Sequence, residues 1–288
     1  MWAPLRGAPR KGDETKMKIG CCLPGGSFMP QGKAEVVTPS EILLAGYEVA
    51  KSVGYDYAES SVGMVMKLTE EEVELLAAKR EKGEFEIQAC NSFIPGTYQI
   101  ADPEQLPALK EYVTEAMRRM ELLGVQVVVF GSGAARKLPG VDPMKELAAI
   151  DAFLKMANEQ AAAHHITIVI EPLNTGETNI FNSVSAGASM CRRLNLSNVK
   201  LLADCYHTHC ENENLYAIEE NADILRHVHV AEPPERICPG KNGGAYVREF
   251  SEHLHRAGYT ERVSIECGYA DFEKDIEESY PLMRELFS

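Results

Sequence analysis

Short apolar segments alternate with longer amphipathic segments eight times along this chain of 288 residues. We expect the apolar segments to be strands, and they span residues 17–23, 55–59, 85–90, 125–130, 167–171, 199–204, 227–231 and 263–266. Because strand–helix alternation with short connections gives right-handed βαβ units, these strands should form a parallel sheet. Eight such units predict an α/β fold, a single closed (β/α)8 TIM barrel rather than an open sheet.

The segments between the strands carry the end signals of helices. Thr69 and Glu72 form a capping box, and Gly54 and Gly124 stand where two helices should end. The expected helices cover residues 39–53, 70–82, 103–123, 143–164, 182–194, 214–222, 244–257 and 272–287.

The length of the chain fits one barrel domain, because such barrels need roughly 250 residues. Residues 1–16 are rich in Pro, Gly, Arg and Lys and lack the apolar core of a secretion signal, so we interpret them as a flexible tail before a catalytic domain over 17–288. The apolar loop 24–30 would lie at the barrel mouth, where it could act as a lid.

Charge and composition exclude two classes of partner. The 29 basic and 43 acidic residues give a net charge of −14, which repels nucleic-acid phosphates, and no basic run offsets it. No apolar run approaches the ~20 residues that span a bilayer, so we expect no membrane partner. The eight cysteines are scattered through a chain long enough to bury a core, which favours reduced thiols and a cytoplasmic protein.

Four strands of the second half each deliver a polar residue near their carboxyl end. Glu171 follows a β-branched run that Pro172 terminates, and Asp204, His229 and Glu266 occupy similar places in the next three strands. Because strand ends converge at the mouth of a parallel barrel, these four side chains should meet. Three carboxylates and one imidazole suit one divalent cation such as Mn²⁺, Mg²⁺ or Co²⁺, whereas structural zinc sites use several Cys or His.

Several neighbouring residues have two readings. His227 faces the same way as His229, so it either supports the metal ligands or is a packed interior histidine. Glu59 either reaches the pocket or forms an ion pair beneath the rim. The cluster Cys205, His207, His209 and Cys210 is too compressed for a zinc knuckle.

The glycine-rich segment after the fourth strand also has two readings. Gly131-Ser132-Gly133, with Arg136 and Lys137, forms either a nest for an anion or a turn. A short glycine run favours the turn.

The ordered set of motifs in the second half carries a family resemblance. It comprises Glu171-Pro172-Leu173-Asn174 followed by Glu177, Asp204 followed by His207, His227-Val228-His229 followed by Arg236, and Ser264-Ile265-Glu266. With these motifs the chain resembles the xylose-isomerase-like barrel superfamily, in particular the sugar-phosphate isomerase and epimerase group that includes ketose 3-epimerases. The resemblance extends from about Met17 to the C-terminus.

This resemblance implies roles for individual residues. Glu171, Asp204, His229 and Glu266 would bind one divalent metal, commonly manganese, and Glu171 and Glu266 would also transfer protons. The oxygens of a sugar or keto-sugar would be held by Glu177, His207 and Arg236. Two features depart from ketose 3-epimerases: Arg236 lies one residue farther from His229, and the loop 23–29 lacks the Trp and Tyr of their sugar pocket.

The resulting hypothesis is a metal-dependent carbohydrate epimerase or isomerase that acts through an enediolate. The alternative is a lyase on the same site, either inosose-dehydratase-like or C-glycoside-cleaving, in which the same base expels a leaving group. A DNA-repair endonuclease would need further His and acidic ligands and a basic groove. A non-enzymatic sugar-binding barrel would not need the full ligand set. The resemblance also implies a homo-oligomer, a dimer or a tetramer.

Overall fold

The computed structural model describes residues 16–25 and 38–288, and it shows eight parallel strands closed into a barrel. Each strand pairs with its neighbour along the chain, and β1 pairs with both β2 and β8, so the sheet has no free edge. The strands are β1 (Lys18–Cys22), β2 (Tyr57–Ser61), β3 (Ile87–Asn91), β4 (Val127–Phe130), β5 (Thr167–Ile170), β6 (Val199–Asp204), β7 (Leu225–Val230) and β8 (Arg262–Ile265). The predicted barrel is confirmed.

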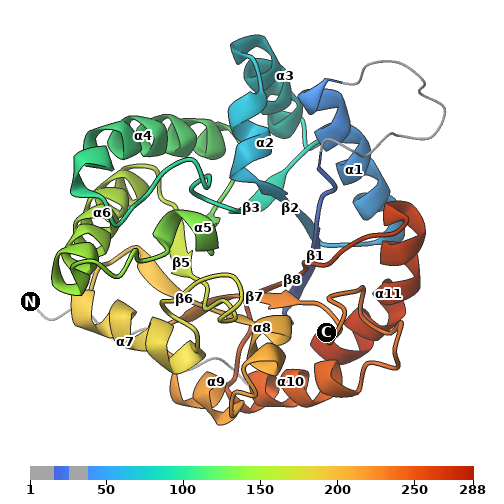
Figure 1. Cartoon of the computed structure of the whole chain (residues 1–288). Helices are drawn as coiled ribbons and strands as arrows, with labels where there is room; N and C mark the ends of the chain where they lie inside the picture. Colours follow the sequence, from blue (N-terminus) through green and yellow to red (C-terminus); the bar gives the residue numbers. More distant parts are fainter. Residues whose placement is uncertain (1–15, 26–37) are drawn as a thin grey trace, which may run out of the picture.

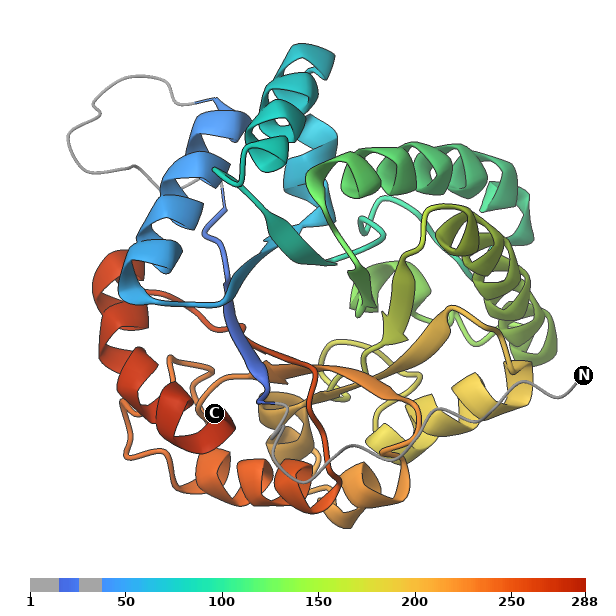
Figure 2. The same ribbon diagram turned by 180° about the vertical axis from the view of Figure 1, so that it is seen from behind.

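Helices surround the strands on all sides, as both views of the molecule show (Figures 1 and 2). The α-helices are α1 (Pro39–Val53), α2 (Val62–Lys67), α3 (Glu70–Glu81), α4 (Leu106–Leu123), α5 (Gly133–Arg136), α6 (Pro143–Ala163), α7 (Val184–Leu194), α8 (Cys205–Cys210), α9 (Tyr216–Glu220), α10 (Ala245–Arg256) and α11 (Phe272–Phe287). A 3₁₀ turn, η1 (Pro103–Gln105), precedes α4. Within the described residues no helix is long and apolar enough to cross a membrane.

The predicted helix ends have the expected physical causes. Thr69 caps α3 through a complete capping box with Glu72, and Gly54 ends α1 with a left-handed φ of 113°. Gly124 ends α4 in the same way, with φ 95°. These residues fix where each helix stops and the chain returns to the barrel.

Some boundaries and three helices differ from the sequence predictions. The second strand begins at Tyr57 rather than at Tyr55, because Asp56 turns back to accept a hydrogen bond from the Ile19 amide at 2.8 Å. The short helices α2, α5 and α8 were not predicted, and each follows a strand with at most one intervening turn. They have too few residues to show a helical period. The tail residues 1–15 and loop residues 26–30 lie outside the described part of the chain.

The barrel interior contains both apolar and buried polar side chains. A small apolar cluster inside the barrel packs Tyr57, Ala89, Val127, Val129, Val169 and Leu202, and the larger core lies between strands and helices. Glu59, His227, His229 and Ser264 form a fully buried, hydrogen-bonded polar layer beside this cluster. This polar layer supports the residues of the mouth.

Candidate metal centre and cavity

The structure brings the four predicted metal-ligating side chains together. Glu171, Asp204, His229 and Glu266 each offer a ligand atom, and these atoms all lie within 4.8 Å of one another. Two ligands on opposite sides of a divalent ion, each at about 2.1 Å, lie about 4.2 Å apart, so one ion can reach the set after small adjustments. The donor set is rich in oxygen and has one imidazole, which suits Mn²⁺, Mg²⁺ or Co²⁺.

Asp204 has one carboxylate oxygen that suits a cation. Its Oδ1 accepts a hydrogen bond from the His207 amide at 2.8 Å and caps α8, whereas its buried Oδ2 has no hydrogen-bond partner in the described structure. A buried carboxylate oxygen without a partner is costly, and a bound cation would satisfy it. One oxygen thus positions the side chain while the other is left for a ligand.

The two ring nitrogens of His229 face different groups. Nε2 lies 3.0 Å from Glu59 Oε1, while Nδ1 lies 3.1 Å from Glu171 Oε1 and 3.4 Å from Glu266 Oε2. Burial lowers the pKa of His229, but Glu59 and Glu266 outweigh it and raise the pKa well above its usual value. With Nε2–H donated to Glu59, Nδ1 is the atom that a metal would take, in competition with a proton.

Glu59 lies at the centre of the buried polar layer. Its carboxylate accepts hydrogen bonds from His229 and also from His227 Nε2 at 2.8 Å and Ser264 Oγ at 2.6 Å. Burial opposes ionisation, but His229 and His227 outweigh it and hold the pKa of Glu59 far below its usual value. The ion-pair reading of Glu59 is therefore correct, and His227 supports His229 through this shared carboxylate.

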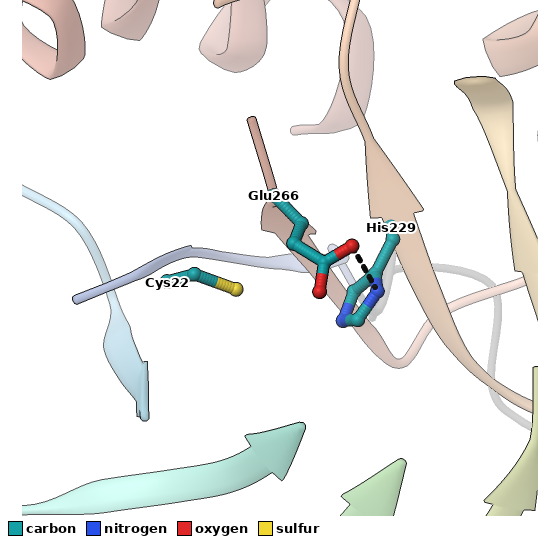
Figure 3. Close-up of side chains that lie close together, drawn as sticks. All are labelled: Cys22, His229 and Glu266. Carbon is teal, nitrogen blue, oxygen red and sulfur yellow. Dashed lines mark ion pairs between the residues drawn. The ribbon is translucent and has the colours of Figure 1, made fainter. Parts of the chain in front are cut away.

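Glu266 is held in place by Asn91 at the end of β3 and by Arg236 from the loop after β7. Asn91 Nδ2 donates to Glu266 Oε1 at 3.0 Å and to the Cys22 sulfur at 3.3 Å, and Arg236 Nη2 donates to Oε2 at 2.6 Å. Figure 3 shows Cys22 and His229 on either side of this carboxylate. Sequence reasoning missed Asn91 as a partner, although it stands at the end of a predicted strand.

The two glutamates have opposite electrostatic surroundings. Burial and the neighbouring Glu266 raise the pKa of Glu171. For Glu266, burial is outweighed by His229 and Arg236, which lower its pKa to about 2. Separated pKa values in neighbouring acids are the usual arrangement of an acid and a base.

Gly131 makes room for the Glu171 carboxylate. A Cβ atom at position 131 would lie 2.1 Å from Glu171 Oε2, which is closer than any real contact. The guanidinium of Arg136 is fully buried and donates to the carbonyl oxygens of Phe130 and Glu171, both at 2.8 Å. Arg136 therefore joins the ends of β4 and β5 and is not part of the cavity lining, whereas Gly131, Ser132 and Gly133 are. Whether this segment binds an anion or is only a turn stays a prediction.

The predicted substrate residues are linked to the cluster by a hydrogen-bond chain. Asn174 donates from its backbone to His207 Nδ1 at 3.2 Å and from its side chain to Glu177 Oε1 at 3.0 Å. Arg236 reaches from Glu266 to Glu177, at 3.3 Å, and its guanidinium lies 5.1 Å from the ring centre of Tyr206. Because His207 Nδ1 accepts, its buried Nε2 carries the proton, and this atom has no partner among the described residues.

A cavity of about 470 Å³ opens beside the cluster. Glu171, Glu177, Arg236 and Glu266 line one side of it. The other side consists mainly of small residues from the loops after β2, β3 and β4, namely Ser61, Gly63, Ser92, Gly96 and 131–135. Two of the three predicted substrate residues, Glu177 and Arg236, thus face the cavity, whereas His207 is not part of its lining.

Comparison with known proteins agrees with this arrangement. The sequence model of the xylose isomerase-like TIM barrel family matches residues 47–286. The chain belongs to this family. Its barrel, with the polar cluster at the carboxyl ends of the strands, is the fold that the resemblance implied.

The proteins that this chain is similar to include several sugar epimerases. The chain is 29% identical to 3-dehydro-D-guloside 4-epimerase from Escherichia coli strain K12, over 78% of this chain and 87% of that protein. It is 24% identical to D-psicose 3-epimerase from Ruminiclostridium cellulolyticum, over 57% of each chain. The crystal structure of a 3-keto-D-glucoside 4-epimerase from E. coli has the same fold, with a TM-score of 0.75 and 21% identity over 94% of this chain and all of that chain.

Proposed function

We propose that this protein is a divalent-metal-dependent epimerase or isomerase of a sugar or keto-sugar, which moves a proton beside a carbonyl through an enediolate. The observation that carries the proposal is the pair Glu171 and Glu266. Both belong to the four-residue cluster, both line the cavity, and their pKa values are shifted in opposite directions.

One ion is proposed as the cofactor, held by Glu171, Asp204, His229 and Glu266, with Mn²⁺ as the first candidate and Mg²⁺ or Co²⁺ as alternatives. When bound, such a cation stabilises the negative charge that develops on the carbonyl and hydroxyl oxygens of the substrate. It also satisfies Asp204 Oδ2.

Glu266 is the proposed base. Its low pKa keeps it ionised, and Asn91 and Arg236 fix the direction of its carboxylate. Glu171 is the proposed acid, because it follows β5 and lines the same cavity as Glu266 from another strand end. Removing a proton from one face of a carbon and returning it to the other inverts that carbon, so a two-carboxylate site can carry out epimerisation.

Glu177 and Arg236 are proposed to bind the hydroxyl oxygens of the substrate from one wall of the cavity. His207 is proposed as a third contact through its unpartnered Nε2–H, which would require a substrate oxygen to reach beyond the cavity lining. The Asn174 side chain and backbone hold Glu177 and His207 in fixed positions relative to each other.

Two substrates are supported by different observations. The motif set and the D-psicose 3-epimerase relative support inversion at C3 of a free ketose. The 4-epimerase relative, which aligns over more of the chain, supports inversion beside the carbonyl of a keto-glycoside. A lyase on the same site remains the competing reaction, because the same base could expel a leaving group.

We also propose a cytoplasmic location, supported by the eight free cysteines.

Proton exchange in D₂O tests the proposal. The protein is freed of metal with a chelator, reloaded with Mn²⁺ and incubated with a panel of ketoses and keto-glycosides. We expect an isomer of unchanged connectivity that carries deuterium at the inverted carbon. Glu171→Gln and Glu266→Gln should abolish exchange, whereas Glu74→Gln, exposed on α3, should not. A dehydrated or cleaved product would identify the lyase, and absence of exchange across the panel would contradict the proposal.

A further inference from the structure

Two thiols lie next to each other beside the candidate site. The sulfur atoms of Cys238 and Cys267 are 2.8 Å apart, and both cysteines are free. A disulfide bond is about 2.05 Å long, so the two atoms need to approach by only about 0.8 Å to form one. The residues are separated by 29 positions in sequence, so this proximity is a product of the fold.

The backbone around both cysteines is already fastened together. Gly268 donates its amide hydrogen to the Arg236 carbonyl at 2.9 Å, and Glu232 and Ile237 form a bridge within the loop that follows β7. The Glu232 carboxylate accepts from the Gly240 and Gly244 amides, at 2.6 and 2.7 Å. The loop is thus held in a fixed conformation against the end of β8, which keeps the two thiols aligned.

Each thiol neighbours a residue of the proposed site. Cys267 directly follows Glu266, and Cys238 stands two residues after Arg236, whose guanidinium contacts the Glu266 carboxylate at 2.6 Å. Cys238 is buried, with 1% of its surface exposed, whereas Cys267 is partly exposed. An oxidant can therefore reach Cys267 first, and Cys238 is placed to react next.

We infer that Cys238 and Cys267 are a redox-active pair, whose reversible disulfide fastens the Arg236 loop to the end of β8. With hydrogen peroxide as the oxidant, the Cys267 sulfur attacks one peroxide oxygen and becomes a sulfenic acid with release of water. The Cys238 sulfur then displaces the hydroxyl group, which leaves as a second water, and the S–S bond forms. Two thiols are oxidised by two electrons, and one peroxide is reduced to two waters.

The oxidation test uses three chosen conditions. Cys210 is the exposed cysteine among the eight, so Cys210→Ser is the background that avoids links between molecules. The protein is metal-free, so that peroxide does not react at a bound ion. Cys238 is buried and Cys267 is only partly exposed, so the incubation lasts hours rather than minutes.

The first readout is intact mass with peptide mapping, which does not depend on the enzymatic activity. We expect peroxide to lower the mass by two hydrogen atoms and to link the peptides that contain Cys238 and Cys267. Dithiothreitol should reverse both changes. In Cys238→Ser the link should be absent, and dimedone should trap the sulfenic acid on Cys267. No loss of mass, a link that uses Cys21 or Cys22 instead, or labelling elsewhere in Cys238→Ser would overturn the inference.

The second readout tests whether the disulfide holds the Arg236 loop in place. Amide hydrogen exchange of residues 233–240 should be slower in the oxidised protein than in the reduced protein, and Cys267→Ser should show no such difference after the same treatment. Equal exchange in the linked and reduced proteins would overturn the claim that the bond fastens this loop.

Discussion

The two halves of the barrel contribute to the candidate site in different ways. Strands β5 to β8 supply the proposed metal-ligand atoms, since Glu171, Asp204, His229 and Glu266 belong to or directly follow them. Strands β1 to β4 supply supporting groups, namely Glu59 beneath His229 and Asn91 against Glu266, together with loops of small residues around the cavity. One half therefore carries the proposed chemistry, and the other fixes its geometry and leaves space for a substrate.

The largest effect should follow from changing a ligand in the β5–β8 half. Glu266→Gln keeps the size of the side chain but removes the charge that pairs with Arg236 and His229. We expect turnover to fall by about 10³-fold or more, as the loss of a general base usually causes. Deuterium exchange with the substrate identified by the panel measures it, and a variant that retains a tenth of the turnover would remove Glu266 from the chemistry.

A supporting residue of the other half should act on the metal and on stability. Glu59→Gln leaves three buried donors, from His227, His229 and Ser264, facing one amide. We expect metal affinity to fall by about 10–100-fold and stability by about 3–5 kcal/mol. Titration calorimetry with Mn²⁺ and urea unfolding measure the two effects.

Glu146→Gln is the matched control for this variant. Glu146 is also buried and accepts three hydrogen bonds, from the amides of Gly140, Val141 and Asp142, but it is not part of the cluster. We expect its substitution to lower stability and to leave metal affinity unchanged. Equal losses of affinity in both variants would show that Glu59 acts only through general stability, and the distinction between the halves would fail.

A smaller effect should come from the space that the β1–β4 half provides. Gly131→Ala places a methyl group against Glu171 Oε2, so the carboxylate must move. We expect turnover to fall about tenfold, with the fold retained, because small misplacements of a reacting group are costly. Gly25→Ala, where nothing lies within 4 Å of the added atom, is the control. Equal activity in the two variants would contradict the proposed position of Glu171.

The last prediction concerns the acid stability of the metal-free protein. Because the folded protein lowers the pKa of Glu266 from 4.5 to about 2, its ionised form stabilises the fold above pH 4.5. This contribution, on the order of 1–3 kcal/mol, should be lost as the pH falls from about 4.5 towards 2. Urea unfolding across this window should show a steeper loss in the wild type than in Glu266→Gln, and parallel curves would contradict the shifted pKa.

The difference between the two halves of the barrel also explains which residues of the site could be predicted from the sequence. The four proposed ligands are polar residues at the ends of apolar strands, so a local pattern reveals them and the barrel topology brings them together. The role of Glu59 depends on His227 and His229, which lie 168 and 170 residues away, and no local pattern encodes that contact. Asn91 depends likewise on Glu266, 175 residues later.

The helices, too, were predicted where a local sequence pattern marks them. Long helices with caps were predicted nearly to the residue, as α1 shows with its Thr38 cap and Gly54 end. The helix α8 was not predicted, because its six residues are too few to show a helical period. Its cap, Asp204, uses one carboxylate oxygen for the cap, and the other oxygen has no hydrogen-bond partner in the described structure. The tail boundary at residue 16 and the oligomeric state stay predictions.

The most direct test of the central claim is a crystal structure of the Mn²⁺-loaded protein with anomalous data at the manganese edge. We predict one anomalous peak, within about 2.0–2.3 Å of one atom each of Glu171, Asp204, His229 and Glu266. A peak that contacts fewer than three of these side chains, or no peak in the cluster at saturating Mn²⁺, would contradict the shared cation.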